Sequence, residues 1–104
     1  MFRVIFEIHR LPDVTHEEFA ARYTSHGPLV RRLPGVRRYT QCLVTGSANL
    51  LGTAADSISI LDFDNEEDYR RADSSREMEA AHEDAASFVG HVVAYYVDAR
   101  EVPA

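Results

Sequence analysis

The order of strand-like and helix-like segments is the feature that most constrains the fold of this chain. In residues 2–9, Phe2 and Val4 alternate with Arg3 and its neighbours in a two-residue period, which is typical of a strand with one face in a core. The full series of expected segments is strand 2–9, helix 16–32, strand 36–45, strand 56–63, helical region 64–88 and strand 90–100. This β-α-β-β-α-β order predicts an α+β fold of the split βαβ, or ferredoxin-like, type with a four-stranded antiparallel sheet.

Local signals indicate where several of these segments begin and end. Thr15 and Glu18 form the capping-box pattern that begins a helix, and the turn residues at 33–35 end it. Gly27-Pro28 lies inside that helix and predicts a break or kink, because proline lacks an amide hydrogen and clashes with the preceding turn. Ser74-Ser75 is expected to interrupt the second helical region, and the small residues of 46–55 are expected to form a loop.

Size and composition predict a single globular domain over residues 1–104. The chain is 45% hydrophobic and 27% charged, as in ordinary globular proteins. An apolar cluster in the first ten residues is interrupted by Arg3, Glu7 and Arg10, so it resembles neither a signal-peptide core nor a membrane span. We therefore expect a cytoplasmic protein with no membrane partner.

Charge and cysteine content exclude several classes of protein. The formal net charge of −6 argues against a nucleic-acid partner, and the absence of lysine excludes Schiff-base chemistry on this chain. Cys42 is the only cysteine, which excludes an internal disulfide, a cysteine-rich zinc site and an Fe–S cluster. Arg31, Arg32, Arg37 and Arg38 form a basic patch that is either a solvated helix end or an attraction for an anionic small molecule.

His26 interrupts the apolar face of the first helix. Its neighbours at helical spacing are Phe19, Tyr23, Leu29, Val30 and Leu33. The imidazole should therefore point toward the interior, and Pro28 leaves the carbonyl of Thr24 without its usual amide partner. Two interpretations remain open: His26 is a hydrogen-bonded core residue, or it is a general acid and base beside a pocket.

Two helical regions on one face of four strands leave the other face of the sheet uncovered. That face is expected to carry Ile58 and Ile60, with either Ile5 or Tyr39, a large apolar area for a monomer. A second sheet is the simplest cover. We therefore predict a homodimer in which the sheets of two subunits close on each other.

The central block of the sequence resembles the EthD family of dimeric α+β barrel proteins. The resemblance lies in HGPLV at 26–30 and LPGVRRY at 33–39, followed by Gln41, with weaker matches at 10–12, 17–19 and 63–64. It implies a two-subunit barrel with one pocket per subunit between sheet and helices. Family members and relatives include lactone isomerases, polyketide cyclases, decarboxylases or dehydratases of aromatic polyketides, and accessory proteins. The enzymes among them typically use no cofactor. In these enzymes the histidine of the first helix is the usual candidate for catalysis, and the resemblance implies that His26 is its counterpart here.

The third strand departs from the family pattern. Members commonly have an aromatic residue near its end, where this chain has Asp62, and an acidic or amide residue two positions earlier, where it has Ile60. Asp62 is expected to face into the barrel and to need a partner. That partner is either an arginine or His26, and a pair with His26 would make Asp62 an orienting catalytic carboxylate.

Four further residues are candidates for substrate binding. Tyr39 and Gln41 share a strand face and are expected to donate hydrogen bonds to a substrate carbonyl, although Tyr39 also suits a core or interface aromatic residue. Tyr23 and His82 lie on apolar helix faces. Each of them either packs in the core or lines the pocket, and the sequence leaves both interpretations open. His16-Glu17 lacks the second histidine of an HExxH site, so we expect no metal.

The sequence thus supports two hypotheses. The first is a cofactor-independent acid–base enzyme of the cyclase, isomerase, dehydratase or decarboxylase type, acting on a small hydrophobic oxygenated ring compound such as a polyketide or lactone intermediate. The second is a non-catalytic small-ligand-binding or accessory protein with the same pocket, in which His26 donates to the carbonyl freed by Pro28.

Overall fold

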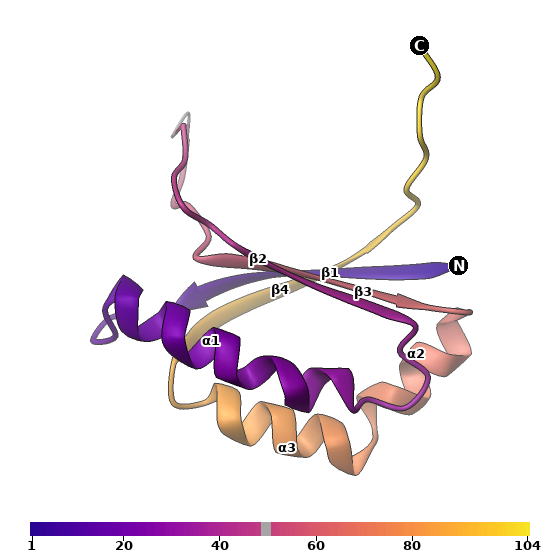
Figure 1. Ribbon diagram of the computed structural model, residues 1–104, viewed down its shortest axis with the longest axis horizontal. Helices are drawn as coiled ribbons and strands as arrows, with labels where there is room; N and C mark the ends of the chain where they lie inside the picture. The colour runs from indigo at the N-terminus through magenta and orange to yellow at the C-terminus, as the bar shows by residue number, and fades with distance from the viewer. Residues whose placement is uncertain (49–50) are drawn as a thin grey trace.

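All helices lie on one face of a four-stranded antiparallel sheet in the computed structural model, which describes residues 1–48 and 51–104 (Figure 1). The elements are β1 (Phe2–Arg10), α1 (His16–Arg31), β2 (Arg38–Leu43), β3 (Ser57–Phe63), α2 (Glu66–Asp73), α3 (Arg76–Ala85) and β4 (Val89–Val97). The predicted order is confirmed. The second helical region is two helices that are separated at Ser74 and Ser75, as expected.

The strand order in the sheet is β2-β3-β1-β4, so β1 and β3 are the central strands. Every pairing is antiparallel. Ile5 of β1 lies opposite Ile60 of β3 on one side and Tyr95 of β4 on the other. This register places alternate residues of each strand on the helix side of the sheet and the remaining residues on the opposite side.

Several expected boundaries were wrong at the ends of elements. The strand expected over 36–45 is Arg38–Leu43, and the one expected over 90–100 is Val89–Val97. The helix α1 is continuous through Gly27 and Pro28, so the expected break is absent. Phe19, Tyr23 and His26 bury one face of α1 before the proline, and the partly buried Val30 packs on the core after it, so tertiary packing holds the helix together. In the expected loop 46–55, residues 49–50 lie outside the described residues.

Side-chain caps begin each helix. The Thr15 hydroxyl accepts a hydrogen bond from the backbone N–H of Glu18 at 3.1 Å, which confirms the predicted start of α1. Asn65 and Ser75 cap α2 and α3 in the same way. At the far end of α1, Gly35 adopts a positive φ of 80°, a conformation that favours glycine.

The core lies between the helices and the sheet in two clusters. One cluster is centred on β1, β3 and α2, and it includes Val4, Leu61, Phe63 and Tyr69. The other joins the start of α1 to the end of the α3 region and consists of Val14, Phe19, Tyr23 and Phe88. The predicted inward stripe of α1 is confirmed, because Phe19, Tyr23 and His26 are its buried residues.

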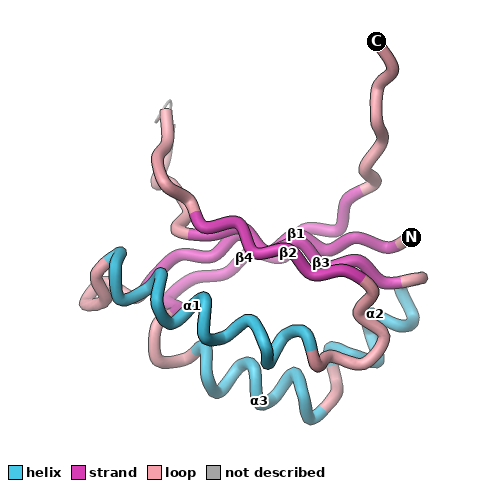
Figure 2. Tube along the Cα trace, viewed as in Figure 1, coloured by secondary structure: helices cyan, strands magenta, loops and turns pink. Residues whose placement is uncertain are grey.

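The opposite face of the sheet has no helix over it (Figure 2). It carries Ile5, Ile58 and Ile60, as expected, while Tyr39 lies on the helix side. Residues 44–48 after β2 and the segment after β4 both extend from the sheet on this uncovered side (Figure 2). Among the described residues, no helix is long and apolar enough to cross a membrane.

Candidate functional site

A cavity of about 180 Å³ lies between α1, α3 and the helix side of the sheet. Most of its lining is apolar and comes from β1, β3, α3 and β4. The polar lining residues are Tyr23, His26, Tyr39, Ser59 and His82. None of the described lining residues is an arginine or a carboxylate, so the cavity wall carries no permanent charge.

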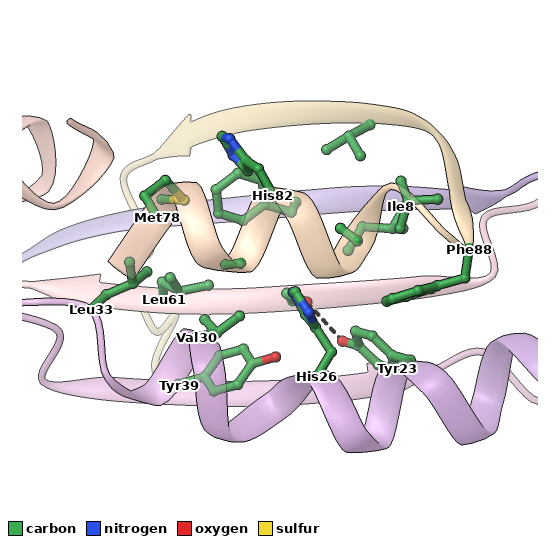
Figure 3. A pocket seen from close by; sticks show the side chains of 16 residues that line it. Ile8, Tyr23, His26, Val30, Leu33, Tyr39, Leu61, Met78, His82 and Phe88 are labelled. Carbon is green, nitrogen blue, oxygen red and sulfur yellow. Dashed lines mark hydrogen bonds between the residues drawn. The ribbon is translucent and has the colours of Figure 1, made fainter. Parts of the chain in front are cut away.

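His26 enters the cavity from the buried face of α1 (Figure 3). The residue is only 9% exposed. The Nδ1 atom lies 2.8 Å from Oδ2 of Asp84 on α3, and the ring meets the edge of Phe88 with 5.6 Å between centroids. A titratable ring is therefore held from two directions at the boundary of an apolar space.

Tyr39 reaches the same cavity from β2 (Figure 3). Its hydroxyl oxygen is buried and has no hydrogen-bond partner among the described residues. Burial raises the pKa of this phenol to about 12. The nearby polar side chains of Gln41 and Ser59 lower the pKa by less. Neither of them has the geometry of a hydrogen bond to the Tyr39 hydroxyl. A buried unpaired hydroxyl costs stability, and such a group in a pocket is ready to bind a ligand atom.

Tyr23 uses its hydroxyl within the protein. The oxygen lies 2.7 Å from the hydroxyl of Ser59 and also donates to the carbonyl of Ile58 at 3.3 Å. The ring stacks on Phe19 with 5.6 Å between centroids, and burial raises the pKa of the phenol. Tyr23 thus both packs against the sheet and lines the cavity. These are the two interpretations that the sequence left open.

Gln41 does not line the cavity, contrary to expectation. Its side-chain amide donates to the backbone carbonyl of Tyr23 at 2.7 Å. The amide reaches the helix because Gly27 leaves room: a β-carbon at Gly27 would lie 3.2 Å from Nε2 of Gln41. The amide therefore joins β2 to α1 and is not placed to bind a substrate carbonyl.

Asp62 is not a partner of His26, so the interpretation as an orienting catalytic carboxylate is wrong. It faces the uncovered side of the sheet, whereas the cavity is on the helix side. Its carboxylate accepts from Nε and Nη2 of Arg3 at 2.7 and 3.0 Å, so an arginine is its partner. The hydrogen bond from Arg3 lowers the pKa of Asp62, and burial opposes this only in part.

His82 lines the cavity from α3 but is itself exposed. It therefore lies at the opening of the cavity, as does Val92 of β4, another lining residue, which is 45% exposed. Asp84 is the one functional candidate that sequence reasoning missed. Its only signal in the sequence was a carboxylate two positions after His82. Among the described residues, no group of three or more His, Cys, Asp or Glu is placed to hold a metal ion.

Comparison with known proteins gives one family and several similar structures. A family model described as the EthD domain matches residues 11–91. No curated protein matches the chain. An EthD family protein from Bacillus halodurans is 22% identical with a TM-score of 0.78, and the match covers 96% of this chain and 99% of that one.

Two other similar structures have the same fold. A dimeric ferredoxin-like protein of unknown function from Thermobifida fusca is 21% identical, with a TM-score of 0.72 and coverage of 92% of this chain and 88% of that one. SnoaB, a cofactor-independent oxygenase from Streptomyces nogalater, is 16% identical, with a TM-score of 0.63 and coverage of 97% and 92%. At these identities the structures support the fold.

Proposed function

We propose that this chain, which belongs to the EthD family, is an acid–base enzyme that moves a proton on a small uncharged ring compound. The observation that carries the proposal is the pairing of two groups in one apolar cavity. They are the imidazole of His26 and the unpartnered hydroxyl of Tyr39. The first can accept and return a proton, and the second can bind an oxygen on which negative charge develops.

The cavity restricts the class of substrate. Because its described lining holds no arginine and no carboxylate, a charged group inside it would lose its hydration without a permanent opposite charge. An apolar cavity of about 150 Å³ engineered into another protein binds benzene, so about 180 Å³ suits a single ring. We therefore propose a neutral monocyclic ketone or lactone, or a larger compound of which one ring enters.

The proposed step uses only these two side chains. His26 takes a proton from the carbon next to a carbonyl, and the electron pair of that C–H bond forms the carbon–carbon double bond of an enolate. The enolate oxygen accepts a hydrogen bond from Tyr39. Where the substrate has a double bond next to that carbon, the product is a dienolate, and return of the proton from His26 to its far carbon completes an isomerisation. Where the next carbon carries a hydroxyl, the enolate electrons form a carbon–carbon double bond as the C–O bond breaks, and the proton from His26 turns the leaving hydroxyl into water. A decarboxylation fits less well, because the substrate carboxylate would lie beside an apolar wall.

The uncovered face of the sheet supports a homodimer as the working form. Ile5, Ile58 and Ile60 lie on this face, and Tyr95 beside them is 47% exposed. An apolar sheet face of this kind is covered in stable proteins. We propose that a second copy of the chain covers it, sheet against sheet.

Proton exchange in heavy water tests the catalytic proposal without knowledge of the product. Small cyclic ketones and lactones are incubated with the protein in D₂O, and deuterium at the carbon next to the carbonyl is followed by NMR. General acid–base catalysis contributes ~10²–10⁴-fold in rate, and His26→Ala should remove that factor. His16→Ala is the matched control, because this histidine lies on the same helix but its side chain is 49% exposed and pairs with Asp56.

The outcomes separate the two hypotheses. Exchange that depends on His26 and survives in the His16→Ala variant supports the enzyme. Binding of a ring compound at Tyr39 and His26 with no exchange supports the non-catalytic ligand-binding alternative. Exchange at the wild-type rate in a folded His26→Ala variant overturns the role of His26.

A further inference from the structure

The hydrogen bond between His26 and Asp84 joins the cavity to the solvent side of the helices. His26 is buried at the cavity wall, whereas the Asp84 side chain is 46% exposed. Asp84 does not line the cavity. It borders a shallow groove on the other side, together with Arg22, Ser25 and Ser87. The carboxylate therefore contacts the ring from outside the space in which a ligand would bind.

The chemistry of the two groups fixes which ring nitrogen carries hydrogen. An ionised carboxylate only accepts hydrogen bonds, and a neutral imidazole has one N–H donor and one bare nitrogen. At 2.8 Å, the Nδ1 atom must therefore be the donor and Nε2 the bare nitrogen. Arg22, which borders the same groove, directs its guanidinium to the carbonyl of Ser87 at 2.9 Å.

We propose that Asp84 is a positioning residue that holds His26 in its Nδ1–H form, so that Nε2 is the atom that takes the proton from the substrate. The role of Nε2 as the proton acceptor rests on the function proposed above. The tautomer does not, because it is a property of the protein alone. When Nε2 takes a proton, the ring becomes a cation beside a carboxylate, which stabilises it. When the proton leaves Nε2, the ring returns to the same tautomer.

Packing around the ring supports a fixed orientation. Phe88 lies edge-on to the imidazole with an interplanar angle of 75°, and it packs in turn on Phe19 of α1. Turning the ring over about its Cβ–Cγ bond would place a carbon where Nδ1 now meets Asp84. The hydrogen bond therefore opposes that flip, while the contact with Phe88 restricts the tilt of the ring plane. The position of His26 is thus determined by α1 and α3 together.

Nitrogen NMR of the histidine ring tests the tautomer directly. Protein with ¹⁵N-labelled histidine is studied in the pH range in which the His26 ring is neutral, and the two ring nitrogens are distinguished by long-range ¹H–¹⁵N correlation. We expect a protonated Nδ1 and a bare Nε2. In Asp84→Asn the side chain can either donate or accept, so the ring should populate both forms. Glu83→Gln, which removes an exposed neighbouring charge, should leave the spectrum unchanged.

The exchange assay in D₂O supplies the second readout. Asp84→Asn should lower the maximal exchange rate by about 10²-fold, the lower end of the effect of acid–base catalysis, with little change in the substrate concentration at half-saturation. Asp84→Glu, which keeps the acceptor, should recover part of the rate. An Nε2–H form in the wild type, or an unchanged tautomer and rate in Asp84→Asn, overturns the inference. The expected tautomer without exchange on any ring compound overturns the proposed function and leaves the orienting role of Asp84 standing.

Discussion

Arg3 and Asp62, directly opposite each other on β1 and β3, form a two-pronged ion pair on the uncovered face of the sheet. Asp62 is 2% exposed, whereas the Arg3 side chain is 33% exposed. The two parallel N–H···O bonds use both carboxylate oxygens, a geometry that is strong and directional. The pair links the two central strands beside the isoleucines that we propose as the dimer contact.

This pair should make the stability of the protein depend on pH in acid. Arg3 lowers the pKa of Asp62 in the folded state, so the unfolded state takes up the proton first as pH falls. The contribution to stability is full above the unfolded pKa of about 4 and is lost as pH falls through the lower folded value. Urea unfolding between neutral and acid pH should show this loss in the wild type and less of it in Asp62→Asn. Asp13→Asn, at an exposed position in the connector before α1, is the control. Equal pH dependence in Asp62→Asn and the wild type would contradict the assignment.

Removal of the Tyr39 hydroxyl should stabilise the free protein and weaken ligand binding. The buried oxygen has no partner, and a buried unsatisfied polar group costs about 1–3 kcal/mol. We expect Tyr39→Phe to raise the free energy of unfolding by about 1 kcal/mol and to lower affinity for a ring ketone. Tyr23→Phe, which loses a hydroxyl that is hydrogen-bonded at 2.7 Å, should instead destabilise. Denaturant unfolding of both variants checks the opposite signs, and destabilisation by Tyr39→Phe would show that its hydroxyl is satisfied in solution.

Gly27 and Gln41 should be coupled energetically. Alanine in a helix is more favourable than glycine by about 0.5–1 kcal/mol, but a β-carbon at Gly27 would lie 3.2 Å from Nε2 of Gln41. We therefore expect Gly27→Ala to be neutral or destabilising in the wild type and stabilising in a Gln41→Ala background. Gln41→Ala alone should cost about 1 kcal/mol for its hydrogen bond to the Tyr23 carbonyl. A double-mutant cycle of unfolding free energies measures the coupling, and additive effects would contradict the contact.

The faces of the strands could be predicted from the sequence because they depend on local alternation. The two-residue period separated Val4 from Ile5 and placed Tyr39 and Gln41 on one face. It left open whether Ile5 or Tyr39 lies on the uncovered side. The alternation continues past the last paired residue, which is why the expected strands were too long. The signals that predict element order and helix starts are also local, because a capping side chain bonds to a backbone group only a few residues along the chain.

The partners of the polar side chains could not be predicted in the same way. His26 and Asp84 are 58 positions apart, and their contact depends on how α1 and α3 pack on the sheet. The sequence indicated that Asp62 needs a partner, yet only the strand register selects Arg3 over His26. Gln41 faces the helices, and the space left by Gly27 lets its amide donate to the backbone of α1.

A single charge on the uncovered face of the sheet should dissociate the proposed homodimer. Ile60 is opposite Ile5 on β1 and Thr40 on β2, so it lies near the middle of that face. An unpaired charge buried at an interface costs about 3–5 kcal/mol, or about 10²–10⁴-fold in the dissociation constant. We expect Ile60→Glu to be folded by circular dichroism but monomeric by analytical ultracentrifugation at concentrations where the wild type is dimeric. Ala80→Glu adds the same charge at an exposed position of α3 and should remain dimeric. If Ile60→Glu stays dimeric, or the wild type is a monomer, the sheet face is not the interface that we propose.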